Sequence, residues 1–130
     1  MPLKGGKTEL VVAMKGEVLG LDPATGKQLW SCANDMTWYV VPSVVAAKGV
    51  LWSLGGRSGI AAVAIRAGGR GDVVQTHRLW TGRKGSNVSS PVVHDGYLYW
   101  MHETRGIAYC AEAMTGTIVY EERVPRAGQV

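Results

Sequence analysis

The residue types that most often carry chemistry are few in this chain and lie far apart. His77, His94 and His102 do not fall at the spacings of metal ligands, and no cysteine lies close enough to complete a site with them. Cys32 and Cys110 are widely separated and belong to no C-x-x-C pair, which excludes a disulfide framework. We expect two half-buried thiols on strands and three structural histidines. The sequence therefore predicts no catalytic residue and no metal site.

Two glycine-rich segments resemble site motifs only in composition. Residues 56–59 (GRSG) lack the G-x-S-x-G spacing of a nucleophile elbow and are interpreted as a turn between strands. In residues 82–86 (GRKGS) the lysine precedes the glycine and no helical pattern follows, so the backbone cradle of a phosphate-binding loop is missing. We expect no cofactor at either segment.

The composition indicates a folded chain without a membrane span. Hydrophobic residues make up 46% of the 130 residues and charged residues 18%, which argues against disorder. Fourteen basic and ten acidic side chains give a net charge of +4, with no run of Lys and Arg longer than two, so we expect a solvated surface and no nucleic-acid partner. The chain has no apolar segment of spanning length and no signal-like N-terminal stretch.

The chain repeats itself. Residues 21–30 (LDPATGKQLW) and 111–120 (AEAMTGTIVY) share a T-G pair followed four positions later by an aromatic residue, and residues 65–80 end in the same Leu-Trp. The aromatic positions are Trp30, Trp80 and Tyr120. A second motif, residues 43–52, matches residues 91–100, where Asp95-Gly96 predicts a tight hairpin. Each unit contains four strands in about 40–50 residues, the size of a β-propeller blade.

The expected strands are apolar at nearly every position instead of alternating. Such strands indicate sheets covered on both faces, as blades are by their neighbours. The Ala-rich segment 60–67 has helical propensity, but the repeat places a strand there. We expect strands near residues 10–14, 17–22, 27–33, 40–46, 49–54, 59–65, 73–80, 89–93, 97–101, 106–110 and 117–123. They form a single partial domain over 1–130, with units at roughly 8–39, 40–88 and 89–130.

The signature DP-x-T-G-x-x-L-W at residues 22–30, with SSPVVHDGYLY at residues 89–99, resembles the pyrroloquinoline-quinone-like propeller repeat. The resemblance implies that Trp30 and Trp80 dock one blade on the next, with Tyr120 as a weaker equivalent. The middle unit departs from the signature with a longer turn (IRAGGRGDV), which we expect to be atypical or mobile. Family enzymes hold the quinone with a metal-binding carboxylate and adjacent cysteines, and this chain has no adjacent cysteines. We expect the cofactor-free type.

The fold class predicted is all-β, with about three four-stranded antiparallel blades in an incomplete ring. An open stack exposes two apolar blade faces, so we expect either a fragment of a longer protein or a self-assembling protomer, and truncation is favoured. If the chain folds alone, it should associate through those faces. An exported parent, periplasmic or extracellular, fits the resemblance, although no signal peptide is present in this chain.

Blade topology brings the loops between strands two and three, and between strand four and the next strand one, to the same face. We take this face as the candidate ligand or partner surface: Trp38, Tyr39, Arg57, Arg83, Lys84, His102 and Arg105. The two aromatic residues can stack on a sugar or anchor a partner, or Trp38 can cap the core. The basic residues can pair with a carboxylate or remain solvated.

Three functions remain open. A non-catalytic module that binds or scaffolds another protein is favoured. The alternatives are a piece of a quinone-dependent dehydrogenase whose active-site residues lie outside this chain, and a carbohydrate-binding propeller that uses Trp38 and Tyr39.

Overall fold

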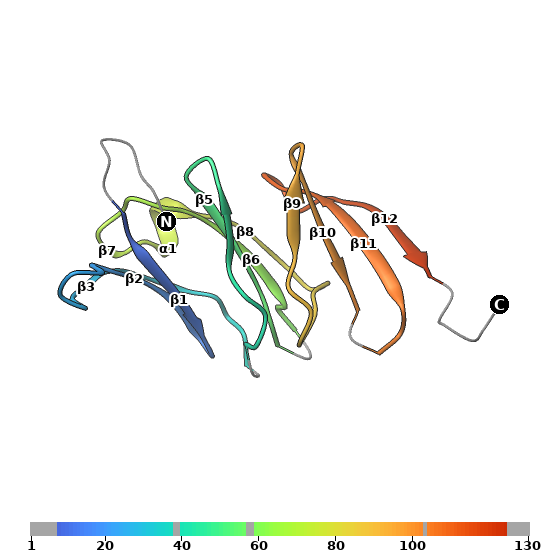
Figure 1. Ribbon diagram of the computed structural model, residues 1–130, viewed down its shortest axis with the longest axis horizontal. Coiled ribbons are helices and arrows are strands. Elements are labelled where there is room, and N and C mark those ends of the chain that lie inside the picture. Colours follow the sequence, from blue (N-terminus) through green and yellow to red (C-terminus); the bar gives the residue numbers. More distant parts are fainter. Residues whose placement is uncertain (1–7, 38–39, 57–58, 103, 125–130) are drawn as a thin grey trace.

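The computed structural model describes residues 8–37, 40–56, 59–102 and 104–124. Within them, twelve strands form three four-stranded sheets, accompanied by one short helix. Figure 1 shows the sheets side by side along the long axis of the molecule, with the first and last strands in opposite halves. The predicted all-β fold of three blades in an open stack is confirmed.

Sheet 1 combines three consecutive antiparallel strands with a short strand from later in the chain. β1 (Leu10–Met14), β2 (Glu17–Leu21) and β3 (Gln28–Ala33) pair in sequence order. β7 (Gly71–Asp72) lies beyond β3 and runs parallel to it. The expected atypical turn of the middle repeat therefore crosses to sheet 1 and extends it by one strand.

Sheet 2 occupies the middle of the stack and is antiparallel throughout. Its strands are β4 (Val45–Ala47), β5 (Val50–Leu54), β6 (Ala62–Arg66) and β8 (Arg78–Gly82). The Ala-rich segment forms β6, as the repeat predicts and helix propensity does not. Full burial of its first four residues, with Ala62 and Ala64 on one face and Val63 and Ile65 on the other, explains why packing overrides that propensity.

Sheet 3 closes the other end with β9 (Val92–His94), β10 (Tyr97–Met101), β11 (Ile107–Glu112) and β12 (Ile118–Arg123). The hairpin between β9 and β10 is the predicted one. Asp95 and Gly96 have φ angles of 50° and 82°, and two consecutive positive values are what the primed turn of a tight hairpin requires.

Two of the predicted strands differ most from the structure. Residues 73–80 do not form one strand, because α1 (Val74–His77) precedes β8. The Asp72 Oδ1 atom accepts the Val74 N–H at 3.0 Å, and the Val73 N–H is drawn to the Ser31 carbonyl of sheet 1 at 2.9 Å, so the chain turns there. The strand expected at 40–46 is shorter and later, since Pro42 has no N–H to donate to a ladder.

The core consists of the two seams between neighbouring sheets. Leu51, Val63 and Ile65 of sheet 2 pack toward sheet 1, while Trp52 and Ala64 pack toward sheet 3. Both sets are at most 3% exposed, so sheet 2 is covered on both faces as its uniformly apolar strands predict.

Among the described residues, the two end sheets are covered on one face only. Leu10, Val12 and Met14 on the outer face of β1 are 37–49% exposed, and on sheet 3 Met101 and Tyr120 are 38% and 40% exposed. The open stack therefore presents an apolar surface at each end.

Candidate binding site at the seam between sheets 2 and 3

A small polar pocket of about 190 Å³ lies at the seam between sheets 2 and 3. It opens where the β5–β6, β8–β9 and β10–β11 loops meet, as blade topology predicts for these loops. Its lining consists of Gly56, Ala61, Arg83, Lys84, Gly85, Ser86, Asn87, His102, Arg105 and Tyr109.

The β8–β9 loop is held tightly against sheet 2 by a glycine. A Cβ atom at Gly85 would lie 2.2 Å from the Ala61 carbonyl oxygen, so no other residue fits without moving the backbone. The buried Ser86 hydroxyl accepts the Ser89 N–H at 2.9 Å, and Ser89 Oγ donates to the Met101 carbonyl at 2.9 Å. These contacts fasten the loop that carries Arg83 and Lys84 to the end of β10.

His102 is oriented by its own loop. Its Nδ1 atom accepts the backbone N–H groups of Thr104 and Arg105, both at 3.2 Å. These two bonds to Nδ1 fix the orientation of the imidazole ring where it lines the pocket.

The charged side chains among the described lining residues are cations. Arg83, Lys84 and Arg105 are exposed side chains of the lining, and the described lining residues include no carboxylate. Lys84 Nζ lies 3.7 Å from Glu121 Oε1, but both side chains are at least 40% exposed, so this ion pair is weak. The arrangement favours an anionic group with several acceptor oxygens.

The pocket is smaller than the roughly 300–1,000 Å³ typical of sites for whole small molecules. At about 190 Å³ it suits a carboxylate side chain better than an organic cofactor. A second, larger groove of about 600 Å³ lies at the opposite strand ends, with an apolar floor that includes Val50, Trp52 and Val93.

The structure brings four of the seven predicted surface residues together: Arg83, Lys84, His102 and Arg105. Trp38, Tyr39 and Arg57 lie outside the described residues. The sequence did not single out Tyr109, because it lies on an apolar strand that is typical of the core. It did not single out Ser86 either, because this is a small residue of a loop.

The three predicted docking positions occupy equivalent places. Trp30 pairs with Gly20, Trp80 with Ala64 and Tyr120 with Cys110, and each sheet has a register shift directly after that pair. The bulge places the aromatic ring at the same point of each sheet. Their surroundings differ, with Trp30 1% and Tyr120 40% exposed.

Trp80 contacts the next sheet through the T-G turn. A Cβ atom added at Gly116 would lie 2.6 Å from the Trp80 ring, so the ring lies directly against the glycine. Trp80 Nε1 donates to the Ala113 carbonyl at 2.8 Å, and Trp52 Nε1 donates to the same oxygen at 2.7 Å. Two indoles of sheet 2 thus converge on one turn of sheet 3.

Trp30 makes a different contact because the middle repeat lacks the T-G turn. Its Nε1 donates to Glu9 Oε1 at 3.3 Å, and the Arg70 guanidinium lies 3.3 Å from Glu9 Oε2. Glu9 is 2% exposed, so a buried carboxylate joins the tryptophan of sheet 1 to the long turn that follows β6.

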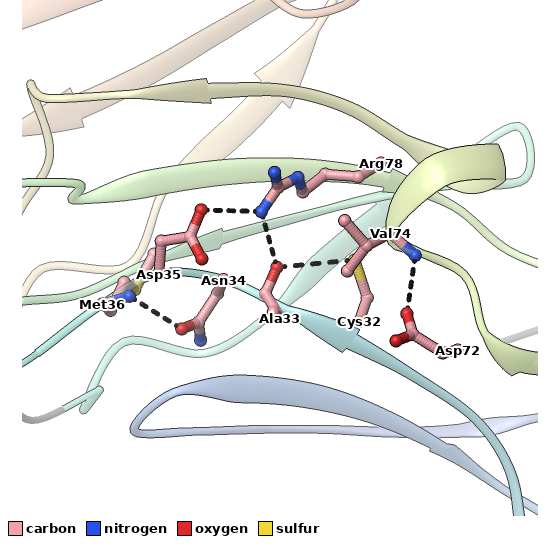
Figure 2. Close-up of polar contacts among 8 residues, drawn as sticks. All are labelled: Cys32, Ala33, Asn34, Asp35, Met36, Asp72, Val74 and Arg78. Atoms are coloured by element: carbon pink, nitrogen blue, oxygen red, sulfur yellow. Dashed lines mark hydrogen bonds and ion pairs between the residues drawn. The ribbon is translucent and has the colours of Figure 1, made fainter.

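Several polar groups at the seam between sheets 1 and 2 are paired with one another (Figure 2). Arg78 Nη1 donates to the Ala33 carbonyl at 3.1 Å and lies 2.8 Å from Asp35 Oδ2. Burial raises the pKa of the Cys32 thiol from its ordinary value of 9.0 to about 11, and the nearby Arg78 charge only partly opposes this. A thiol held neutral in this way is a structural group and a poor nucleophile.

Other chemistry finds no support in the described residues. They contain no group of three or more His, Cys, Asp or Glu side chains placed to hold a metal ion. In the same part of the chain no helix has both the length and the apolar character needed to cross a bilayer.

Stacked four-stranded sheets, with Trp80 of sheet 2 lying against the T-G turn of sheet 3, define blades of a β-propeller. The chain belongs to the family described as outer membrane protein assembly factor BamB, whose family model matches residues 1–122. The crystal structure of BamB from Moraxella catarrhalis superposes with a TM-score of 0.66 at 16% identity, over 97% of this chain and 38% of that one. The sequence resemblance to the pyrroloquinoline-quinone-like repeat is thereby confirmed.

A second relative is an enzyme subunit. The glycerol dehydrogenase large subunit of Gluconobacter thailandicus is 35% identical over 51 residues, which are 39% of this chain and 7% of that protein. The chain thus spans well under half the length of either relative.

Proposed function

We propose that this chain is a non-catalytic binding module that holds an acidic segment of another protein in the pocket between sheets 2 and 3. The observation that carries the proposal is the convergence of Arg83, Lys84 and Arg105 around a pocket the size of a side chain. The family description names a protein assembly factor, which supports a protein as the partner. A partner that supplies a row of carboxylates matches both the charge and the small volume.

The pocket has room to bind one acidic side chain at a time. A carboxylate accepts from guanidinium groups in charge-assisted bonds, which are about twice as strong as neutral ones. Neighbouring acidic residues of the segment would remain near the exposed cations at the rim. Because those cations are exposed, most of this attraction should be screened by salt.

The test uses a fluorescent hexaglutamate peptide and its hexaglutamine counterpart as probes. We expect the acidic peptide alone to bind, with an affinity that falls as salt rises from about 0.05 to 0.3 M. Exchanging Arg83 and Arg105 for Ala together should weaken binding at least about tenfold, or about 1.4 kcal/mol. Lys48→Ala is the matched control, since Lys48 is an exposed cation at the opposite groove.

Equal binding of the two peptides, or equal losses in the double variant and in Lys48→Ala, would contradict the proposal. The first result would show that binding does not depend on the charge of the peptide. The second would show that binding depends on the overall charge of the protein and not on this pocket.

A quinone-dependent dehydrogenase is the second candidate, supported by the similarity over 51 residues to the glycerol dehydrogenase large subunit. In that case catalytic residues belong to sequence outside this chain. Quinone reconstitution followed by a dye-reduction assay on any longer natural form separates the two candidates, because a scaffold gives no turnover.

We also propose that the apolar outer faces of sheets 1 and 3 associate. The exposed Val12 and Tyr120 lie on the two faces concerned.

A further inference from the structure

The larger groove, of about 600 Å³, lies between two equivalent hairpins at the seam of sheets 2 and 3. One wall is formed by the β4–β5 hairpin and the end of β6, and the other by the β9–β10 hairpin and the T-G turn of sheet 3. We call it the hairpin groove, after the turns at residues 48–49 and 95–96. Both walls belong to sheets that pack on each other within this chain, so the groove does not depend on the outer faces of the stack. Its volume falls in the roughly 300–1,000 Å³ range of sites for whole small molecules.

The floor of the hairpin groove is apolar and fixed. Val50 and Trp52 are 2% and 3% exposed and belong to the core of the seam. Trp52 Nε1 donates to the Ala113 carbonyl at 2.7 Å, so the indole has no donor left for a ligand. Val93 is half-buried beside the floor, and Met114 is 47% exposed at the rim. A ligand in the groove therefore meets hydrocarbon and a flexible thioether, which favours an apolar body.

Two cations lie together on the wall that sheet 2 provides. Arg66 pairs with Val50 at the end of β6, and the next residue, Ala67, donates its N–H to the Gly49 carbonyl at 2.9 Å. Arg66 is therefore held beside the turn that carries Lys48, and both side chains are exposed. Within the described part of the chain, neither cation has an ion-pair partner. Two like charges next to an apolar floor favour a ligand that brings a negative charge.

Lys48 occupies a backbone position that does not suit a lysine. The Lys48-Gly49 turn has φ angles of 51° and 80°, close to the 50° and 82° of Asp95-Gly96. The first position of such a turn favours Asn, Asp or Gly, because most other L residues are strained at a positive φ. Asp95 follows this preference and Lys48 does not. A strained residue at a groove, with a charge that no described residue pairs, indicates a role in binding.

The opposite wall carries the reverse charge. Asp95 Oδ2 lies 3.2 Å from His94 Nε2, and the two side chains are 84% and 73% exposed. A second carboxylate on a ligand would meet the Asp95 charge across the groove. The hairpin groove thus favours a ligand with one anionic end and an uncharged remainder.

We propose that the hairpin groove binds an aliphatic monocarboxylate, with its carboxylate at Lys48 and Arg66 and its chain along the apolar floor. The two cations bind the headgroup through charge-assisted hydrogen bonds. The chain excludes water from Val93 and Met114, and each methylene that becomes fully buried strengthens binding about fourfold. The hairpin groove and the polar pocket lie at opposite strand ends of the same seam, so this site is separate from the one in the proposed function.

The first test measures binding of octanoate to the 130-residue chain by isothermal titration calorimetry. Butanoate, octanol and suberate, the dicarboxylate with eight carbons, serve as comparisons. We expect each of these three to bind at least about tenfold more weakly than octanoate, because they lack methylenes, lack the anion, or bring a second one. No binding of octanoate at millimolar concentrations overturns the proposal. Equal binding of octanoate and any of the three comparison compounds does so as well.

The decisive variant, Lys48→Asn/Arg66→Gln, removes both cations. Since Asn suits a positive φ, Lys48→Asn alone should keep or raise Tm, whereas the double variant should bind octanoate at least about tenfold more weakly. Lys15→Asn/Lys27→Gln is the matched control, because it removes the same charge from exposed lysines in turns of sheet 1. The control should bind octanoate like the unaltered chain. Equal losses in the two double variants, or unchanged binding in the first, overturn the proposal.

The polar pocket supplies a second control. Exchanging Arg83 and Arg105 for Ala together should leave octanoate binding unchanged, since both side chains lie at the other strand ends. Loss of octanoate binding in that variant would place the ligand at the polar pocket and overturn its assignment to the hairpin groove. Neither result bears on binding of the hexaglutamate peptide, which is measured in a separate assay.

Discussion

Docking of Trp80 on the T-G turn can be isolated from the backbone effect of losing a glycine, because the chain contains the same turn twice. Gly116→Ala and Gly26→Ala both place an alanine at a positive φ angle, of 77° and 75° respectively. That conformation costs an L residue roughly 1–2 kcal/mol in either turn. Only at Gly116 does the new methyl group also meet an indole, at 2.6 Å.

The difference between the two variants measures the docking contact. Overpacking of a well-packed site costs about 1–3 kcal/mol, so Gly116→Ala should lower the free energy of unfolding by about 2–5 kcal/mol and Gly26→Ala by about 1–2. For a chain of this size the difference corresponds to about 4–12 °C in Tm.

The assay is urea unfolding followed by tryptophan fluorescence, with both variants in the Tyr120→Glu background. That background weakens the proposed association of the outer faces, so that the Gly26 turn stays free of a second copy. Equal losses of stability in the two variants would refute the reasoning, because they would show that the Trp80 ring yields to the methyl group without cost.

Three further predictions concern the seams. Leu51→Ala should cost about 2–5 kcal/mol by denaturant unfolding, and Leu10→Ala under about 1, because Leu51 is 0% and Leu10 49% exposed; equal costs would contradict the two-seam core. Arg70→Met should lower the free energy of unfolding by about 1–3 kcal/mol, since it removes a cation from the buried Glu9 carboxylate. Thermal unfolding tests this prediction. If the double variant Glu9→Gln/Arg70→Met is no more stable than Arg70→Met, the charge of Glu9 is not the cause. The pKa of Cys32 is raised by burial to about 11, so the unfolded chain loses this proton first and stability should fall between about pH 9 and about pH 11. Urea midpoints across that range test it, and Cys32→Ala should remove this part of the fall.

The sequence was most informative where the repeat and the packing agree. The hairpin at Asp95-Gly96 and the strand at residues 62–66 follow from positive-φ turn chemistry and from the periodic placement of blades. The equivalence of Trp30, Trp80 and Tyr120 was visible as spacing, although spacing alone did not reveal the register shift that accompanies each of them.

The sequence pattern could not predict contacts between segments that lie far apart in the chain. The helix at residues 74–77 depends on the Asp72 side chain and on a carbonyl of Ser31, which lies in another sheet. Likewise, Arg83 and Arg105 were assigned to one face by topology, but their meeting at one pocket depends on how Gly85 approaches Ala61. Local propensity contains no information on either contact.

β7 couples the stability of sheet 1 to that of sheet 2. Its two residues belong to the segment that leaves sheet 2, but they pair as a strand with Trp30 and Ser31 of sheet 1. Sheet 1 therefore cannot separate from sheet 2 without also breaking the backbone hydrogen bonds of its own outermost strand. Protection of the Val73 amide, which donates to Ser31, should report the opening of this whole half of the molecule and not the fraying of a loop.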